Sequence, residues 1–363
     1  GGEWNSVKKD LNSVPVKIAL AFPDIYEIGM SFLGFKVLYE IINGREDACA
    51  ERIFAPWKDM EELLRAKTIP LLTIESLAPA KNFDIVGFTI QYERSYTNIL
   101  LMLDLMQIPL KSADRNDSHP VIIAGGPGAS NPEPLADFID AFVLGEGEEV
   151  IGEIIDAFKQ CAGKTGARNR NEILNCLKNI PGVYVPSFYA VTYNADETIK
   201  EVIPKNGAPA QVKNRMLADI SKARIPLKPV VPFIETVHDR VSLEIQRGCT
   251  HGCRFCHAGM TARPLRMRKQ REILDAAKES VQNTGYEEIS LISLSSADYP
   301  EIANLAQSIS NSLSDSYVSI SIPSSRIDNF SIELGKVLQE VRRSSLTFAP
   351  EAGTDRLRAV INK

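Results

Sequence analysis

Short apolar runs alternate with amphipathic segments along the first part of the chain. Residues 16–23 form a nearly continuous apolar run that ends at a proline, which is typical of a strand buried on both faces of a parallel sheet. This alternation predicts an α/β fold, a doubly wound (Rossmann-like) parallel sheet over residues 16–160. We expect its strands at 16–23, 84–90, 120–124 and 141–144, and its helices at 32–42, 95–106 and 149–159.

The segments on either side of this predicted domain are more polar. Residues 1–15 are expected to form a flexible arm. Residues 161–240 are expected to form a linker, because 162–180 are polar and 204–240 carry many Pro and Lys residues. Within it, residues 183–186 and 188–193 have a β-like pattern and should pair with the segment around Ile203 as a β-hairpin.

A second alternation of strands and helices begins at Val241. Four successive strand–helix units without a closing half predict a partial (β/α) barrel over residues 241–363. We therefore expect the chain to be a fragment of a longer protein. The strands are expected at 241–245, 288–293, 317–322 and 345–349, and the helices at 272–282, 300–313, 332–341 and from Thr354 onward.

Composition narrows the class of protein. The net charge of −5 argues against a protein coated in nucleic-acid contacts, although it leaves room for a local basic patch. No apolar run approaches the roughly 20 residues of a membrane helix, and the first four residues lack the features of a signal peptide. Six cysteines are too few for a disulfide scaffold. We therefore expect a cytoplasmic protein with no membrane association.

Three of the cysteines lie within eight residues, directly after an expected strand. Cys249, Cys253 and Cys256 offer three thiolates from one loop, which suits an iron–sulfur cluster with one open iron. The alternative is a zinc site with His251 or His257 as fourth ligand. Zinc sites usually come as two separated pairs of ligands, and no second pair follows here.

The pattern Cys-x-x-x-Cys-x-aromatic-Cys after the first barrel strand resembles the radical S-adenosylmethionine (radical SAM) superfamily. The resemblance implies that Cys249, Cys253 and Cys256 hold a [4Fe–4S] cluster and that Phe255 packs near the adenine of S-adenosylmethionine. It also implies that reductive cleavage of S-adenosylmethionine gives a 5′-deoxyadenosyl radical, which abstracts hydrogen from a substrate. An electron donor such as flavodoxin or ferredoxin would then be a partner.

Further candidates for binding S-adenosylmethionine follow the other barrel strands, because active sites of such barrels lie at the carboxyl ends of strands. The superfamily carries a Gly-Gly-Glu type motif after the second strand, where this chain has Ser residues and an Asp. Asp298 could instead cap the next helix, and Thr354 or Asp355 could cap the last one. The candidates are Ser295, Ser296 and Asp298, then Ser324 and Arg326, and finally Glu351 in a Glu-x-Gly-x-Asp-Arg segment that resembles many members.

A basic run begins within the cysteine cluster and continues beyond it. Its six Lys and Arg residues could attract a polyanion such as RNA, or could simply form a solvated loop. RNA is therefore one substrate class that we keep open. The run comprises Arg254, Arg263, Arg266, Arg268, Lys269 and Arg271.

The N-terminal segment resembles the cobalamin-binding (B12-binding) domain of B12-dependent radical SAM proteins. The family's Asp-x-His-x-x-Gly motif appears here as Asp24, Tyr26 and Gly29, with Tyr in place of the axial His. A corrinoid would bind without a protein nitrogen on cobalt, or the domain has lost corrinoid binding. The other candidate corrinoid loops carry Gly125 and Gly126, and Gly145 and Gly147.

Together these features resemble an uncharacterised bacterial branch of radical SAM proteins with a B12-domain-like N-terminal module. The expected function is reductive cleavage of S-adenosylmethionine for substrate modification, with RNA or the ribosome as a substrate. The alternative is a non-catalytic iron–sulfur or zinc module with a structural or sensing role, which a fourth protein ligand near the three cysteines would favour.

Overall fold

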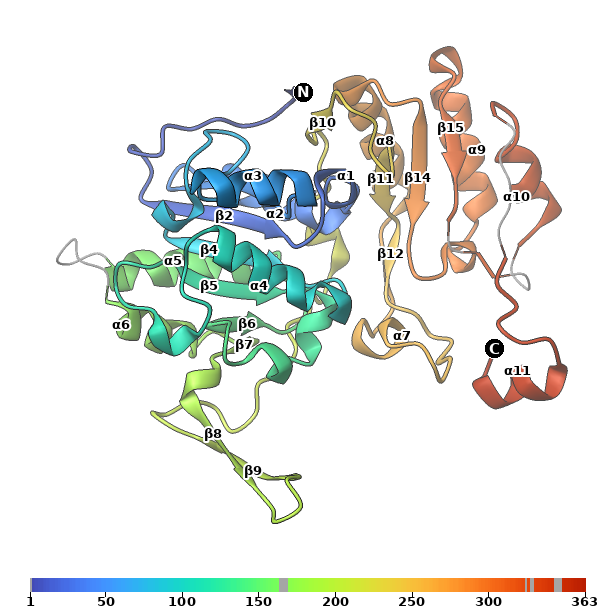
Figure 1. Cartoon of the computed structure of the whole chain (residues 1–363). Helices are drawn as coiled ribbons and strands as arrows, with labels where there is room; N and C mark the ends of the chain where they lie inside the picture. The colour runs from blue at the N-terminus through green and yellow to red at the C-terminus, as the bar shows by residue number, and fades with distance from the viewer. Residues whose placement is uncertain (1, 163–168, 324, 327–329, 343–347) are drawn as a thin grey trace. The chain divides into compact units, whose positions relative to one another are not determined.

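The chain divides into two compact units, which Figure 1 shows in a computed structural model. The structure describes residues 2–162, 169–323, 325–326, 330–342 and 348–363. We call Val7–Met216 the N-terminal unit, and Gly1–Ser6 together with Leu217–Lys363 the C-terminal unit. The change of unit at residue 217 falls inside the segment 161–240, and the domain boundaries given above remain predictions.

The N-terminal unit is built on a sheet of six strands within the described residues, in the order β3-β2-β4-β5-β6-β7. The first five strands run parallel and β7 is antiparallel to β6. This confirms the predicted Rossmann-like sheet, although β3 and the helix after it were not predicted. The strands are β2 (Val16–Phe22), β3 (Ala48–Phe54), β4 (Ile85–Thr89), β5 (Val121–Gly125), β6 (Ala141–Val143) and β7 (Val183–Tyr184).

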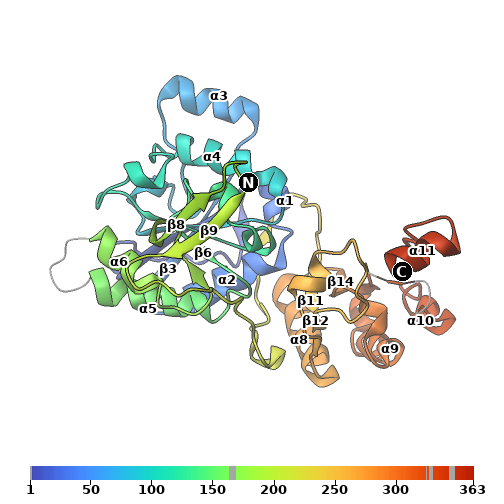
Figure 2. The same cartoon turned by 90° about the horizontal axis from the view of Figure 1, so that it is seen from below.

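Helices cover both faces of this sheet. In Figure 2, α3 and α4 lie on one face, and α2 and α5 lie on the other. The main core of the unit packs apolar side chains of β2, β4 and β5 against Leu64 of α3 and Met102 of α4. The helices are α1 (Tyr26–Gly29), α2 (Leu33–Asn43), α3 (Lys58–Lys67), α4 (Tyr96–Leu105), α5 (Val150–Ala162) and α6 (Arg170–Leu177).

Strand β3 is buried along its whole length although it carries two charged side chains. Arg52 Nε lies 2.6 Å from Glu75 Oε1, and both side chains are almost fully buried. Glu51 accepts hydrogen bonds from Thr73 Oγ1 at 2.5 Å and Ser76 Oγ at 2.6 Å. The loop that contains Thr73 and Glu75 therefore provides the partners that allow this strand to be buried.

The polar region after α5 differs partly from its prediction. A β-hairpin of β8 (Tyr189–Tyr193) and β9 (Ile199–Pro204) is present as predicted. Residues 183–184, expected in the same hairpin, instead extend the main sheet as β7. Cys161 and Cys176 form a disulfide between α5 and α6, which the sequence analysis did not predict.

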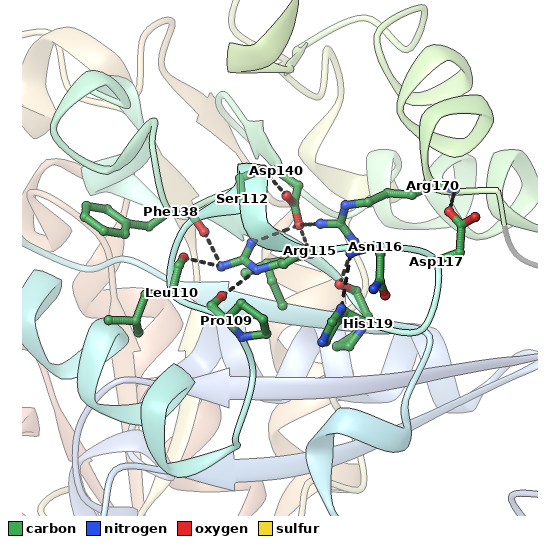
Figure 3. A network of polar contacts seen from close by, with 12 residues as sticks. Pro109, Leu110, Ser112, Arg115, Asn116, Asp117, His119, Phe138, Asp140 and Arg170 are labelled. Carbon is green, nitrogen blue, oxygen red and sulfur yellow. Dashed lines mark hydrogen bonds and ion pairs between the residues drawn. The ribbon is translucent and has the colours of Figure 1, made fainter.

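A buried polar network ties together the amino ends of β5 and β6 (Figure 3). Asp140, directly before β6, accepts the Ile122 N–H at 2.7 Å. The same carboxylate pairs with Arg115 Nη1 at 3.1 Å and with the Arg170 guanidinium. Ser112 donates to its other oxygen. Because the Asp140 and Arg115 side chains have no solvent exposure, this network is part of the unit's interior.

The C-terminal unit is built on a three-stranded parallel sheet within the described residues, in the order β11-β14-β15. Its strands are β11 (Val241–Glu244), β14 (Glu288–Ile292) and β15 (Ser319–Ser321). These elements agree with the predicted partial barrel. Residues 345–347 of the predicted fourth strand lie outside the described residues, and residues 348–349 are not in a strand. The longer helices are α8 (Gln270–Thr284), α9 (Ile302–Ser312), α10 (Ile332–Val337) and α11 (Asp355–Ile361).

Short pairs of strands complete this unit. β1 (Glu3–Trp4) pairs with β10 (Val231–Pro232), so the start of the chain joins the C-terminal unit. β12 (Gln246–Arg247) pairs with β13 (Arg266–Met267) on either side of the short helix α7 (Ala258–Thr261). Residues 2–15, for which the sequence predicts a flexible arm, make further contacts, such as the Val7 N–H with Tyr39 Oη at 2.9 Å.

Helix length and composition in the described ranges leave no candidate for a membrane span. The longest helix of the C-terminal unit, α8, is amphipathic, with Ile273, Ala277 and Val281 buried on one side. It ends at Gly285, whose φ of 71° suits the left-handed conformation of a helix terminus.

Candidate functional site

The three clustered cysteines lie on the loop that follows β11. Gly248, just before Cys249, has a φ of +92°, and a Cβ there would lie 2.6 Å from Pro264 O. Glycine is therefore required where the chain leaves β12. The pairing of Arg247 with Arg266 joins the two ends of the loop at its base. We call residues 249–256 the cysteine loop.

The thiols of the cysteine loop are free and partly exposed. Cys256 N–H donates to Cys253 O at 3.0 Å, which forms a turn between these two residues. The Cys256 Sγ accepts a hydrogen bond from Gly259 N–H at 3.2 Å. In the described part of the chain, no three His, Cys, Asp or Glu side chains are gathered as a metal site. The residues fit an iron–sulfur cluster because of their chemistry, since one loop carries three free thiols that can act as ligands.

Two residues of the basic run are buried and serve the fold. Arg266 Nη1 donates to Leu217 O at 2.6 Å, and Arg268 Nη2 donates to Ala223 O at 2.8 Å. Both side chains hold the segment before β11 onto this unit, and they are not available to a polyanion. Arg254, Arg263, Lys269 and Arg271 are exposed.

The loop after β14 brings the predicted Ser residues next to the cysteine loop's strand. Ser296 Oγ donates to Leu291 O at 3.0 Å and is fully buried. Gln246, which the sequence analysis missed, donates from Nε2 to Ser295 O at 2.7 Å. Gln246 Oε1 and Ser295 Oγ are buried without a hydrogen-bond partner among the described residues. Two such atoms at the carboxyl edge of neighbouring strands suit the polar groups of a ligand.

Asp298 contacts the cysteine loop. Its Oδ2 lies 2.5 Å from His251 Nε2. The alternative that Asp298 caps the next helix is wrong, because α9 begins at Ile302 with Glu301 at its N-cap. His251 Nε2 is engaged with this carboxylate, so only Nδ1 would remain for a metal.

The remaining candidates of this unit lie in different settings. Phe255 is 54% exposed. Glu351 accepts from Lys363 Nζ at 2.8 Å. Thr354 caps α11, as one alternative predicted, by accepting the Leu357 N–H at 3.3 Å. Arg326 is half-buried, and Ser324 lies outside the described residues.

Packing within the N-terminal unit explains two of the four glycines in the predicted loops at 125–126 and 145–147. A Cβ on Gly126 would lie 2.7 Å from Ile90 O, and one on Gly145 would lie 2.1 Å from Arg215 O. Gly125 and Gly147 have only ordinary contacts at 3.6 Å. The close approaches that require glycine are thus made by the unit's own backbone.

Tyr26, which stands where the family has the axial His, packs inside the N-terminal unit. The Tyr26 ring packs edge-on against Phe54, with centroids 5.2 Å apart. A Cβ on Gly29 would lie 2.4 Å from the same Phe54 ring. Asp24 Oδ1 accepts the Ile25 N–H at 2.8 Å. Asp24, Tyr26 and Gly29 are thus used in the unit's own packing, and these contacts by themselves do not form a corrinoid cradle.

Comparisons with known proteins agree with this arrangement. Residues 34–186 match the family model of radical SAM proteins, N-terminal, and residues 243–363 match that of the radical SAM superfamily. A protein of the archaeon Methanocaldococcus jannaschii, "Uncharacterized protein MJ0966", is 27% identical over 347 residues. That match covers 95% of this chain and 63% of the relative, so the chain spans less than two thirds of that protein.

Two solved structures of the radical S-adenosylmethionine methyltransferase TsrM from Kitasatospora setae share the fold. One, with tryptophan substrate and a SAM analog (aza-SAM) bound, has a TM-score of 0.58 at 14% identity, over 94% of this chain and 60% of that one. The other, with cobalamin and a [4Fe–4S] cluster bound, has a TM-score of 0.53 at 13% identity, over 89% and 56%. The cysteine motif, the partial barrel and the two family matches agree: the chain belongs to the radical SAM superfamily.

Proposed function

We propose that this protein is a radical SAM enzyme whose Cys249, Cys253 and Cys256 hold a [4Fe–4S] cluster. One observation carries the proposal: three free thiols lie on a single loop after the first strand of the sheet, in a segment that matches the radical SAM superfamily. When bound, the cluster supplies the electron that cleaves S-adenosylmethionine to a 5′-deoxyadenosyl radical.

The residues of the second loop would bind the methionine part of S-adenosylmethionine. Gln246 Oε1 is a buried acceptor suited to an ammonium group, and Ser295 Oγ can donate to a carboxylate. Ser296 is engaged with Leu291 O and would shape the turn rather than contact the ligand. Arg326, Ser324 and Glu351 stay as proposed contacts after later strands, and Phe255 as a proposed contact to the adenine.

The proposed function also implies an electron donor, a cellular location and a class of substrate. A one-electron donor such as flavodoxin or ferredoxin would reduce the cluster, and we propose a cytoplasmic location, as the sequence predicts. If RNA is the substrate, the exposed Lys and Arg side chains of the basic run would bind its phosphates. With only four such residues exposed, binding to single-stranded RNA should weaken with salt at a logarithmic slope no steeper than about −2.8.

Anaerobic reconstitution tests the function. The full chain receives iron and sulfide, then dithionite and S-adenosylmethionine, and 5′-deoxyadenosine is measured by mass spectrometry. We expect a brown cluster and 5′-deoxyadenosine from the native chain, and neither from C249A, C253A or C256A. The control C49A should keep its iron, because Cys49 is buried in β3. A native chain with a full cluster and no 5′-deoxyadenosine would favour the non-catalytic module, and a triple variant that keeps its iron would refute the ligand assignment.

A further inference from the structure

The side chains of His251 and Asp298 join two loops at the carboxyl edge of the C-terminal sheet. His251 lies midway between Cys249 and Cys253, and Asp298 follows the neighbouring strand β14. Their Nε2 and Oδ2 atoms are 2.5 Å apart, and the side chains are 26% and 17% exposed. Since an ionised carboxylate only accepts, Nε2 carries the hydrogen of this contact.

Asp298 is held in place in the loop that follows β14. It ends a short 3-10 turn, Ser296–Asp298, and its N–H donates to Ser295 O at 3.1 Å. The Ser296 hydroxyl fixes that turn to Leu291 O in the strand. The carboxylate therefore presents a fixed anchor to the more exposed cysteine loop.

A second attachment holds the same part of the loop from the other side. Asn362 Nδ2 donates to His251 O at 2.9 Å and to Gly252 O at 3.1 Å. Arg254 N–H donates to Ile361 O at 3.0 Å. Asn362 caps α11 in the left-handed region, with φ 58° and ψ 50°, which Asn tolerates better than most residues. The stretch between Cys249 and Cys253 is thus clamped by two elements.

We propose that Asp298 is a positioning residue that acts through His251 to orient the cysteine loop and to keep the cluster's reduction potential low. This rests on the proposed function, in which the loop's three cysteines bind the cluster. Reduction potentials of such clusters depend on nearby charge, hydrogen bonding and exposure around the ligating sulfurs. A partly buried carboxylate one hydrogen bond from the loop disfavours the addition of an electron, since solvent screens it only partly.

The proposal differs from the two other roles that the sequence allows Asp298. As a direct ligand of S-adenosylmethionine, Asp298 would change the affinity for that molecule, and any effect of its charge on the potential would not depend on His251. As a turn residue only, it would change neither quantity once the chain is folded. A positioning role moves the potential in the absence of S-adenosylmethionine.

The experiment is an EPR-monitored redox titration of the anaerobically reconstituted full chain, without S-adenosylmethionine. D298N, which removes the charge at nearly constant size, should raise the midpoint potential. In the H251A background, the same change should have less than half that effect, because the path through His251 is lost. D275N, which removes an exposed carboxylate of α8, is the matched control and should leave the potential at the native value.

Several results would overturn this proposal. An unchanged potential in D298N, with or without weaker binding of S-adenosylmethionine in equilibrium dialysis, would assign Asp298 to one of the other roles. A full D298N shift that persists in H251A would separate Asp298 from His251. If D298N fails to fold, H251A alone decides, and an unchanged potential refutes the proposal. A native chain that takes up no cluster would instead refute the proposed function itself.

Discussion

The network around Asp140 gives a sharp test of what stabilises the N-terminal unit. D140N removes the only carboxylate that pairs, among the described residues, with both Arg115 and Arg170. Both buried guanidiniums then lose this ion-pair partner. Burial already lowers the pKa of Arg115, and Arg170 lowers it further, while Asp140 opposes them. Breaking a buried ion pair in this way costs about 3–5 kcal/mol.

A cost of this size increases the equilibrium constant for local opening of the network by a factor between about one hundred and a few thousand. Hydrogen exchange with mass spectrometry measures it locally, which suits a chain of two units that need not unfold in one step. Peptides that cover β5 and β6 should lose protection in D140N, and β11 should not. The control D114N removes an exposed carboxylate nearby and should change exchange less than twofold. A loss of protection below tenfold in D140N would refute this account of the network.

Three further predictions use other parts of the chain. Burial raises the pKa of the Cys49 thiol to about 11, so iodoacetamide at pH 8 should modify the three partly exposed loop thiols of the metal-free native chain and spare Cys49; modification of Cys49 at a similar rate would contradict its burial. G145A should destabilise the N-terminal unit by roughly 2–5 kcal/mol in urea unfolding, since the new Cβ would lie 2.1 Å from Arg215 O at a φ of +98°. The control G34A, whose Cβ would have no atom within 4 Å, should be neutral or stabilising. After incubation with hydroxocobalamin and desalting, the chain should retain no corrinoid, and one corrinoid per chain would refute our interpretation of the glycine loops.

The sequence predicts this fold well wherever an element is uniformly apolar or clearly amphipathic. Strand β2 and helix α8 are examples, because their burial patterns follow simple periods. Strand β3 could not be found in this way, since Glu51 and Arg52 interrupt its apolar run. Their partners Thr73 and Glu75 come from a distant loop, and only the folded chain brings them together. The Cys161–Cys176 disulfide likewise has no local signal.

The candidate site shows the same limit. The spacing of the three cysteines identifies the loop because the ligands of one cluster lie close in sequence. Gln246 and Asn362 carry no comparable pattern, since each contacts the site through a single amide group. Asp298 was found by its position after a strand, but its contact with His251 depends on how two neighbouring strands are aligned. Contacts between loops therefore need the structure.

The pairing of β1 with β10 has a consequence for how the chain is made. The Asn5 side chain donates to Pro229 O and to Asn283 O, partners that are 224 and 278 residues away in the sequence. Residues 2–6 are synthesised before the N-terminal unit, yet these two partners of Asn5 come only after the whole of that unit. Contacts of such sequence separation form late and slowly. A tag or truncation at residues 2–6 should therefore disturb the unit that carries the cysteine loop rather than the unit that is adjacent in sequence.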